Sequence, residues 1–184
     1  MATKRLVISG YGQVELNNVA FRRDGRVEAQ GAPNATDFAN IPVENGMLLA
    51  VDDANHCVKL PKDGSLPIGL VYSTEHMYDE RTPGLKNFKL NGSDDFFPRL
   101  GYLSVGDKYR TNCICYDSTE FTTEEALITA LKACATTPVY GMADASGATK
   151  LSATAGTFGP KLKVVAFDTM PDGQKGVKLQ VLAD

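Results

Sequence analysis

The stretch "KLKVVAFDTMPDGQKGVKLQVL" (Lys161 to Leu182) decides the fold class, because it contains two extended runs joined by a turn. In the second run Val177, Leu179 and Val181 alternate with polar residues, which is the period of a half-buried strand. Pro171-Asp172-Gly173 between the runs has the residue types of a tight turn. The stretch therefore predicts a β-hairpin, and a β-hairpin predicts a sheet.

Further hairpins are indicated along the chain. "FRRDGRVEA" places Asp24-Gly25 between extended flanks, and Asp-Gly supplies the backbone angles of a type I′ turn. "RLGYLSVGDKYRTNCICYD" contains a strand, a turn at Gly106-Asp107 and a long alternating strand. In that strand we expect one face to carry Tyr109, Thr111, Cys113 and Cys115, and the other face to carry Arg110, Asn112, Ile114 and Tyr116.

One helix is predicted over about Thr123–Ala135. "TTEEALITALKACATT" has Thr122 and Glu125 at the spacing of a capping box, followed by apolar residues at helical spacing. Two stretches are predicted to be long loops, namely 30–42 and 73–97. We therefore predict a mainly β protein, a small barrel or sandwich built from hairpins with one short helix. An N-terminal arm and hairpin (1–45) would precede a β-rich body (46–184) with an inserted loop region at 73–97.

"GMLLAVDDANHCVKL" (Gly46 to Leu60) raises the question of catalysis, because His56 and Cys57 stand close to Asp52 and Asp53. A weak internal repeat favours a turn instead. "DANHCVKL" (53–60) and "DASGATKL" (144–151) both begin with Asp-Ala and end with Lys-Leu, and both follow similar extended runs. The second copy lacks the histidine and the cysteine. A pattern that persists without its reactive residues indicates backbone geometry, so we interpret Asp53 to Cys57 as a hairpin turn.

Other candidate sites are weaker still. Cys113 and Cys115 with His56 or His76 could be proposed as zinc ligands, but structural zinc sites use wider spacings. Asp94 and Asp95 could be proposed for calcium, but the alternating ligands of a dedicated loop are missing. No nucleotide-binding or hydrolase motif is present. We expect no enzyme, no cofactor and no bound metal.

Composition bounds the partners. The 184 residues carry a net charge of −3, and the basic residues are scattered, so nucleic acid is not expected as a partner. No apolar run approaches the roughly 18 residues of a membrane span, and no signal-peptide core is present. Four cysteines without a disulfide pattern predict assembly in a reducing cytoplasm. A β-rich body with long polar loops is typical of a protein whose partners are other proteins.

The chain resembles tailed-bacteriophage virion proteins, and the small β-rich head decoration (capsid cement) proteins most of all. The features that carry the resemblance are "ENGMLLAVD" (44–52), "LSVGDKY" (103–109) and the C-terminal hairpin, with further likeness over 5–30. The resemblance implies a protein of the virion surface that is assembled in the host cytoplasm, binds the major capsid protein as a homotrimer and stabilises the shell. It transfers no catalytic residues.

A strand-like arm suits such a partner, because an extended segment can add to an open sheet edge. Lys4, Arg5, Leu6, Val7 and Ile8 are the candidate capsid-binding residues, and a frayed terminus is the alternative. Two other roles stay open. One is a different virion component, such as a tail tube, a connector or a fibre base. The other is a carbohydrate- or receptor-binding module that uses the exposed aromatic residues of the region from Tyr72 to Phe97, which include Tyr78, Phe88 and Phe96.

Overall fold

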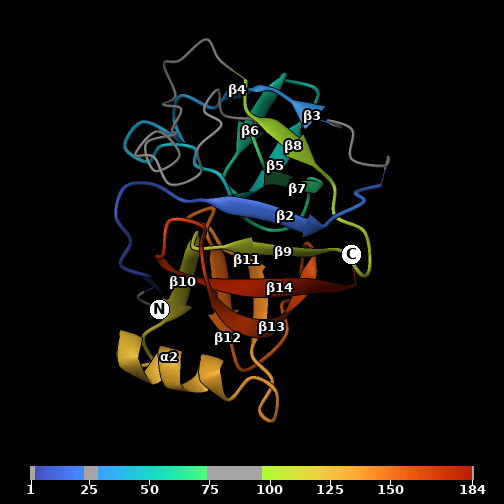
Figure 1. Ribbon diagram of the computed structural model, residues 1–184. Coiled ribbons are helices and arrows are strands. Elements are labelled where there is room, and N and C mark those ends of the chain that lie inside the picture. Colours follow the sequence, from blue (N-terminus) through green and yellow to red (C-terminus); the bar gives the residue numbers. More distant parts are fainter. Residues whose placement is uncertain (1–2, 23–28, 74–96, 184) are drawn as a thin grey trace.

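The computed structural model describes residues 3–22, 29–73 and 97–183. Of these residues, 41% lie in strands and 6% in a helix, so the prediction of a mainly β fold is confirmed. The described strands form two sheets, and the one described helix lies at the end of the molecule opposite the smaller sheet (Figure 1). The Asp24-Gly25 turn and most of the 73–97 loop lie outside the described residues.

The larger sheet has eight described strands. Their spatial order is β1 (Thr3–Arg5), β10 (Ile114–Asp117), β12 (Thr149–Ser152), β11 (Tyr140–Ala143), β13 (Lys161–Thr169), β14 (Lys175–Ala183), β9 (Lys108–Thr111) and β2 (Val14–Asn18). All neighbours are antiparallel except β10 and β12. No pairing joins β1 to β2 among the described residues, so the sheet is open and not a closed barrel.

The smaller sheet has six described strands in the order β3 (Ala29–Gln30), β8 (Arg99–Gly101), β7 (Ile68–Val71), β5 (Leu48–Asp52), β6 (Cys57–Lys59) and β4 (Ala32–Pro33). Segment 1–45 therefore contributes strands to both sheets. The predicted 30–42 loop contains the short strand β4 and a turn whose Phe38 side chain is buried.

Two hydrophobic cores hold the sheets together. The first core lies inside the curved larger sheet and includes side chains from β9, β10, β12, β13 and β14. The second core lies around the smaller sheet and reaches Cys113 and Cys115. Strand β5 joins the two cores, because Leu48 belongs to the first core while Leu49 and Val51 belong to the second. The sheets thus pack in the manner of a sandwich, and β5 is buried on both faces.

The C-terminal hairpin is confirmed. β13 and β14 pair in antiparallel register from Lys161↔Ala183 to Thr169↔Lys175, and Val177, Leu179 and Val181 are buried. The Met170 amide donates a hydrogen bond to the Gln174 carbonyl at 2.8 Å, and this bond closes the turn. This hairpin supplies the two longest strands of the described fold.

The helix is confirmed with different limits. α2 spans Glu124–Lys132, and the hydroxyl of Thr123 accepts a hydrogen bond from the Ala126 amide at 3.2 Å. The cap is therefore Thr123 and not Thr122, so Glu125 does not hold the capping-box position. Leu127 and Leu131 bury one face of the helix in the first core, where it contacts β13.

The expected alternation through 109–116 is wrong in one respect. Tyr109 lies in the first core with Ile114, whereas Cys113 and Cys115 lie in the second. The predicted single strand is broken, because the Ile114 amide bonds back to the Asn112 carbonyl at 2.9 Å in a tight bend. β9 ends before this bend and β10 begins after it. The alternation of side chains therefore changes phase at the bend, and Tyr109 of β9 shares the first core with Ile114 of β10 and not with Cys115.

Candidate interaction edge at the N-terminal strand

The N-terminal segment is an edge strand of the larger sheet. β1 pairs with β10 through Thr3↔Asp117, Lys4↔Tyr116 and Arg5↔Cys115, and no described strand pairs with its other side. The Leu6 amide donates to the Ile114 carbonyl at 3.0 Å. Because bonding directions alternate along a strand, the backbone groups of Thr3 and Arg5 point to the outer side of the edge.

The segment after β1 is fixed by side chains from the far end of the sequence. The Val7 amide donates to Glu124 of α2 at 3.2 Å. The Ser9 amide and carbonyl both bond the Gln174 side chain, at 2.5 and 3.3 Å. Residues 3–9 are therefore an ordered part of the fold and not a frayed arm.

The five candidate capsid-binding residues have different environments. Leu6 is 2% exposed and lies in the first core, and Ile8 packs against the same core. Arg5 is committed to an internal ion pair. Lys4 and Val7 remain exposed, and Val7 is 78% exposed. Of the five, only Lys4 and Val7 direct their side chains to solvent, so these two could contact a partner through their side chains.

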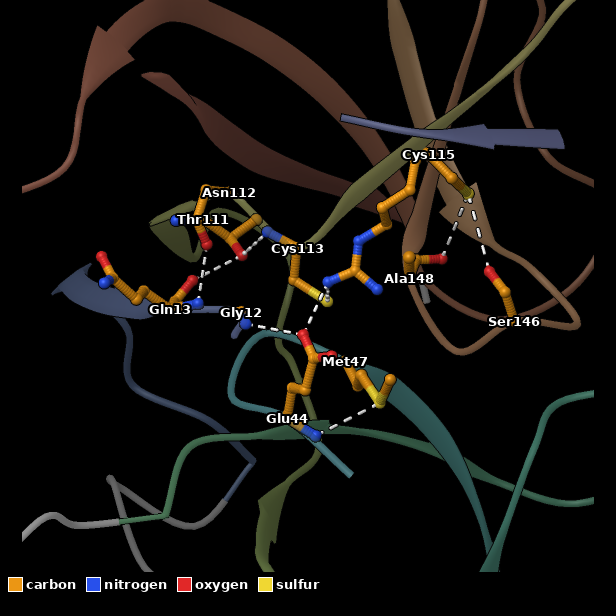
Figure 2. Close-up of polar contacts among 11 residues, drawn as sticks. Gly12, Gln13, Glu44, Met47, Thr111, Asn112, Cys113, Cys115, Ser146 and Ala148 are labelled. Carbon is orange, nitrogen blue, oxygen red and sulfur yellow. Dashed lines mark hydrogen bonds and ion pairs between the residues drawn. The ribbon is translucent and has the colours of Figure 1, made fainter. Parts of the chain in front are cut away.

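The ion pair of Arg5 with Glu44, which is labelled in Figure 2, joins the edge strand to the loop before β5. Arg5 Nη2 donates to Glu44 Oε2 at 2.7 Å, and the same oxygen accepts the Gly12 amide at 2.6 Å. The Glu44 side chain is 10% exposed and that of Arg5 33%. A buried carboxylate needs such partners, so Glu44 fastens residues 5 and 12 to the smaller sheet.

Three segments cross at this point. The Gln13 amide donates to Asn112 Oδ1 at 2.7 Å, and Thr111 Oγ1 donates to the Gln13 carbonyl at 2.7 Å. The crossing is tight, since a Cβ on Gly46, whose φ is +85°, would lie 2.2 Å from Thr111 Oγ1. Sequence reasoning missed this junction, because its residues are about 30 to 100 positions apart and no local pattern marks them.

Cys113 is adjacent to this junction, whereas the Cys115 sulfur faces Ser146 and Ala148, as Figure 2 shows. Arg5 Nη2 lies 3.4 Å from Cys113 Sγ. Burial raises the pKa of the Cys113 thiol to about 12, although the nearby guanidinium of Arg5 opposes the shift. Burial also raises the pKa of Cys115. Both thiols are therefore neutral near pH 7, and a neutral buried thiol is a poor nucleophile and a poor metal ligand.

The structure places His56 and Cys57 as the turn interpretation predicted. β5 and β6 form an antiparallel hairpin, and His56 in its turn has a φ of +51°. The second copy of the repeat forms the β11–β12 hairpin, where Gly147 at the corresponding position has a φ of +80°. In each turn the amide of this residue bonds the carbonyl of the aspartate three positions earlier. The repeat therefore preserves a left-handed turn, and the prediction is confirmed.

The aspartate before the first turn is held as a carboxylate. Asp52 Oδ2 lies 2.5 Å from Lys59 Nζ, and the Asn55 amide bonds the other oxygen at 3.1 Å. The hydrogen bond from Lys59, with those from Asn55, lowers the pKa of Asp52 to about 2. An adjacent hollow, lined by residues 59–66 with Ala50 and Ile68, holds about 100 Å³. Ligand pockets usually reach about 300–1,000 Å³, so this hollow would hold only a very small molecule.

The remaining candidates are only partly covered by the described residues. His76, Asp94 and Asp95 lie outside them, as do Tyr78, Phe88 and Phe96. Within the described ranges, no group of three potential metal ligands comes together. The Tyr72 ring packs against Phe21 with centroids 4.8 Å apart, whereas Phe97 is 48% exposed. Nor does any described helix have the length and apolar character needed to cross a membrane.

Comparison with known proteins gave no match, whether with family models, with curated proteins or with solved structures.

Proposed function

We propose that the chain is a virion structural protein of a tailed bacteriophage, namely a head decoration protein that binds the outer surface of the major capsid shell and stabilises it. The resemblance of segments 44–52, 103–109 and 161–182 to such proteins supports this role, as does the mainly β two-sheet body.

One observation carries the proposal, namely that the N-terminal edge strand is ordered before any partner binds. Fixing a flexible residue costs roughly 1–2 kcal/mol in backbone entropy, which a free arm would lose on docking. Glu44, Glu124 and Gln174 already hold residues 5–9 in place. The outer backbone groups of Thr3 and Arg5, with the exposed side chains of Lys4 and Val7, therefore form a preorganised edge to which a shell strand can add.

This edge is short, so one copy makes few contacts with the shell. Linked copies increase avidity by roughly 10²–10⁴, which favours a symmetric oligomer at the symmetric positions of a shell. The expected assembly is a homotrimer. Light scattering on the purified full chain tests this, since a trimer has three times the 19.8 kDa mass of one chain.

The test of the proposed function is co-sedimentation of the full chain with heads that lack it, followed by heating of the particles. A decoration protein pellets with the heads to a fixed stoichiometry and raises the temperature at which they release DNA. Failure of the intact protein to bind heads at all would exclude the decoration role.

A further inference from the structure

The outer face of the larger sheet carries a concentration of positive charge. Across β13, β14 and β9, Lys163 lies opposite Gln180, and Gln180 lies opposite Lys108. The next row places Lys178 opposite Arg110. Directly paired residues share a face, and the intervening residues Leu179 and Tyr109 are buried in the first core. The lysine side chains therefore project from the opposite, outer face.

The acidic residues of this face are already paired. Arg110 contacts Glu15 at 3.3 Å and Asp168 at 2.9 Å, so its charge is more than balanced. No described carboxylate lies within ion-pair distance of Lys108, Lys163 or Lys178. With Lys161 at the end of β13, the described residues of the face comprise five basic and two acidic groups, a net charge of +3, whereas the whole chain has −3.

Apolar side chains flank the lysines at two irregularities of the hairpin. The register shifts between Val164 and Ala166 and again between Lys161 and Leu162. Val165 is the extra residue at the first shift and Leu182 at the second, and they are 36% and 43% exposed. Bulges commonly direct a side chain to a functional surface. Here both of them present a large apolar residue beside the basic group.

We propose that this basic face, defined as Lys108, Lys163, Val165, Lys178 and Leu182, docks on an acidic protein surface. This inference rests on the proposed function, and the acidic surface is then that of the capsid shell. Lysines around an apolar contact suit carboxylates of a protein partner. Nucleic acid is disfavoured, because the one arginine of the face is held by two carboxylates and the rest of the chain is strongly negative.

The experiment uses the full chain and two matched variants. K163E/K178E reverses two charges on the basic face, and K62E/K132E makes the same net change at two exposed lysines elsewhere. Circular dichroism checks the fold of each variant, and K163Q/K178Q replaces the first variant if it does not fold. The probes are poly-L-glutamate, double-stranded DNA and undecorated heads, each at low and at moderate salt.

The expected result is that K163E/K178E binds both poly-L-glutamate and heads at least about tenfold more weakly, while K62E/K132E stays close to the unmodified chain. K163R/K178R, which keeps the charge, should retain the binding of the unmodified chain.

Binding of heads that is unchanged in K163E/K178E would overturn the inference while leaving the decoration role intact. If the unmodified chain binds poly-L-glutamate but not heads, and K163E/K178E loses the binding to poly-L-glutamate, the decoration role is excluded while docking of the basic face on an acidic protein surface is supported. Stronger binding to DNA than to poly-L-glutamate, or self-association that K163E/K178E abolishes, would assign the face to nucleic acid or to a second copy and so overturn the proposal.

Discussion

The guanidinium of Arg5 and the carboxylate of Glu44 form an ion pair of 2.7 Å between residues 39 positions apart. This pair joins an edge strand of the larger sheet to the loop that leads into the smaller sheet. Because Glu44 also accepts the Gly12 amide, its carboxylate has two donors in a mostly buried position. The pair therefore connects the larger sheet to the smaller sheet through a mostly buried carboxylate.

The first prediction is that Arg5→Met lowers the free energy of unfolding by about 1–3 kcal/mol, because Glu44 is left buried with one donor fewer. Arg5 is one-third exposed, so the loss should be smaller than for a fully buried pair. Lys62→Met is the control, since Lys62 and Asp37 form a longer and more exposed pair worth about 0–1 kcal/mol. Urea unfolding measures both. Equal losses in the two variants would show that the Arg5 pair has no special role.

A second prediction concerns pH. Hydrogen bonds from Lys59 and Asn55 lower the pKa of Asp52 to about 2, and those from Thr119 and then Lys150 lower the pKa of Asp117 to about 2. In the unfolded chain both carboxyls bind protons near pH 4, so the unfolded state takes up protons first as the pH falls. The stability that these groups contribute is therefore complete above about pH 4 and is lost as the pH falls toward about 2.

Urea midpoints measured at several pH values between 5 and 2 test this. D52N/D117N should be less stable than the unmodified chain at pH 5, and the difference should shrink at the acid end. A difference that stays constant over this range would mean that neither carboxyl is linked to folding.

A third prediction uses the repeated turn. His56→Asn combined with Cys57→Val should leave folding near normal, because asparagine tolerates the left-handed backbone that His56 adopts. Gly147→Ala should cost about 1–2 kcal/mol, because an alanine is disfavoured at a φ of +80°. Its Cβ would also approach Leu49 and Met47 at 3.1 and 3.2 Å. Thermal unfolding compares the variants. If the folded His56→Asn/Cys57→Val variant lost a measurable activity, the interpretation of these residues as a turn without a catalytic role would be wrong.

Local signals predicted the local structure well. The hairpin at 161–182 and the helix near Thr123 follow from short-range periodicity and turn chemistry, and both are present. The pairing of β1 with β10 could not be predicted, because contacts over more than 100 residues leave no trace in a local pattern. The bend at Asn112 was missed for a related reason, since alternation runs through it without interruption although a backbone hydrogen bond turns the chain there. The junction at Glu44 depends both on the long-range pairing of β1 with β10 and on this bend.

The last prediction separates folding from binding at the N-terminal strand. An arm that only contacts a partner could be removed without harm, but Leu6 is in the first core, so deletion of residues 1–9 should destabilise the fold. Leu6→Ala alone should cost about 2–5 kcal/mol in the free energy of unfolding.

K4E/V7S changes the two exposed side chains and should stay within about 0.5 kcal/mol of the unmodified chain in urea unfolding. If the edge docks on the shell, K4E/V7S should nevertheless fail to co-sediment with undecorated heads, because it places a carboxylate and a polar group at the contact. A K4E/V7S variant that folds and binds heads as well as the unmodified chain would exclude the Lys4 and Val7 side chains from the interface and leave the docking to the edge backbone or to the basic face.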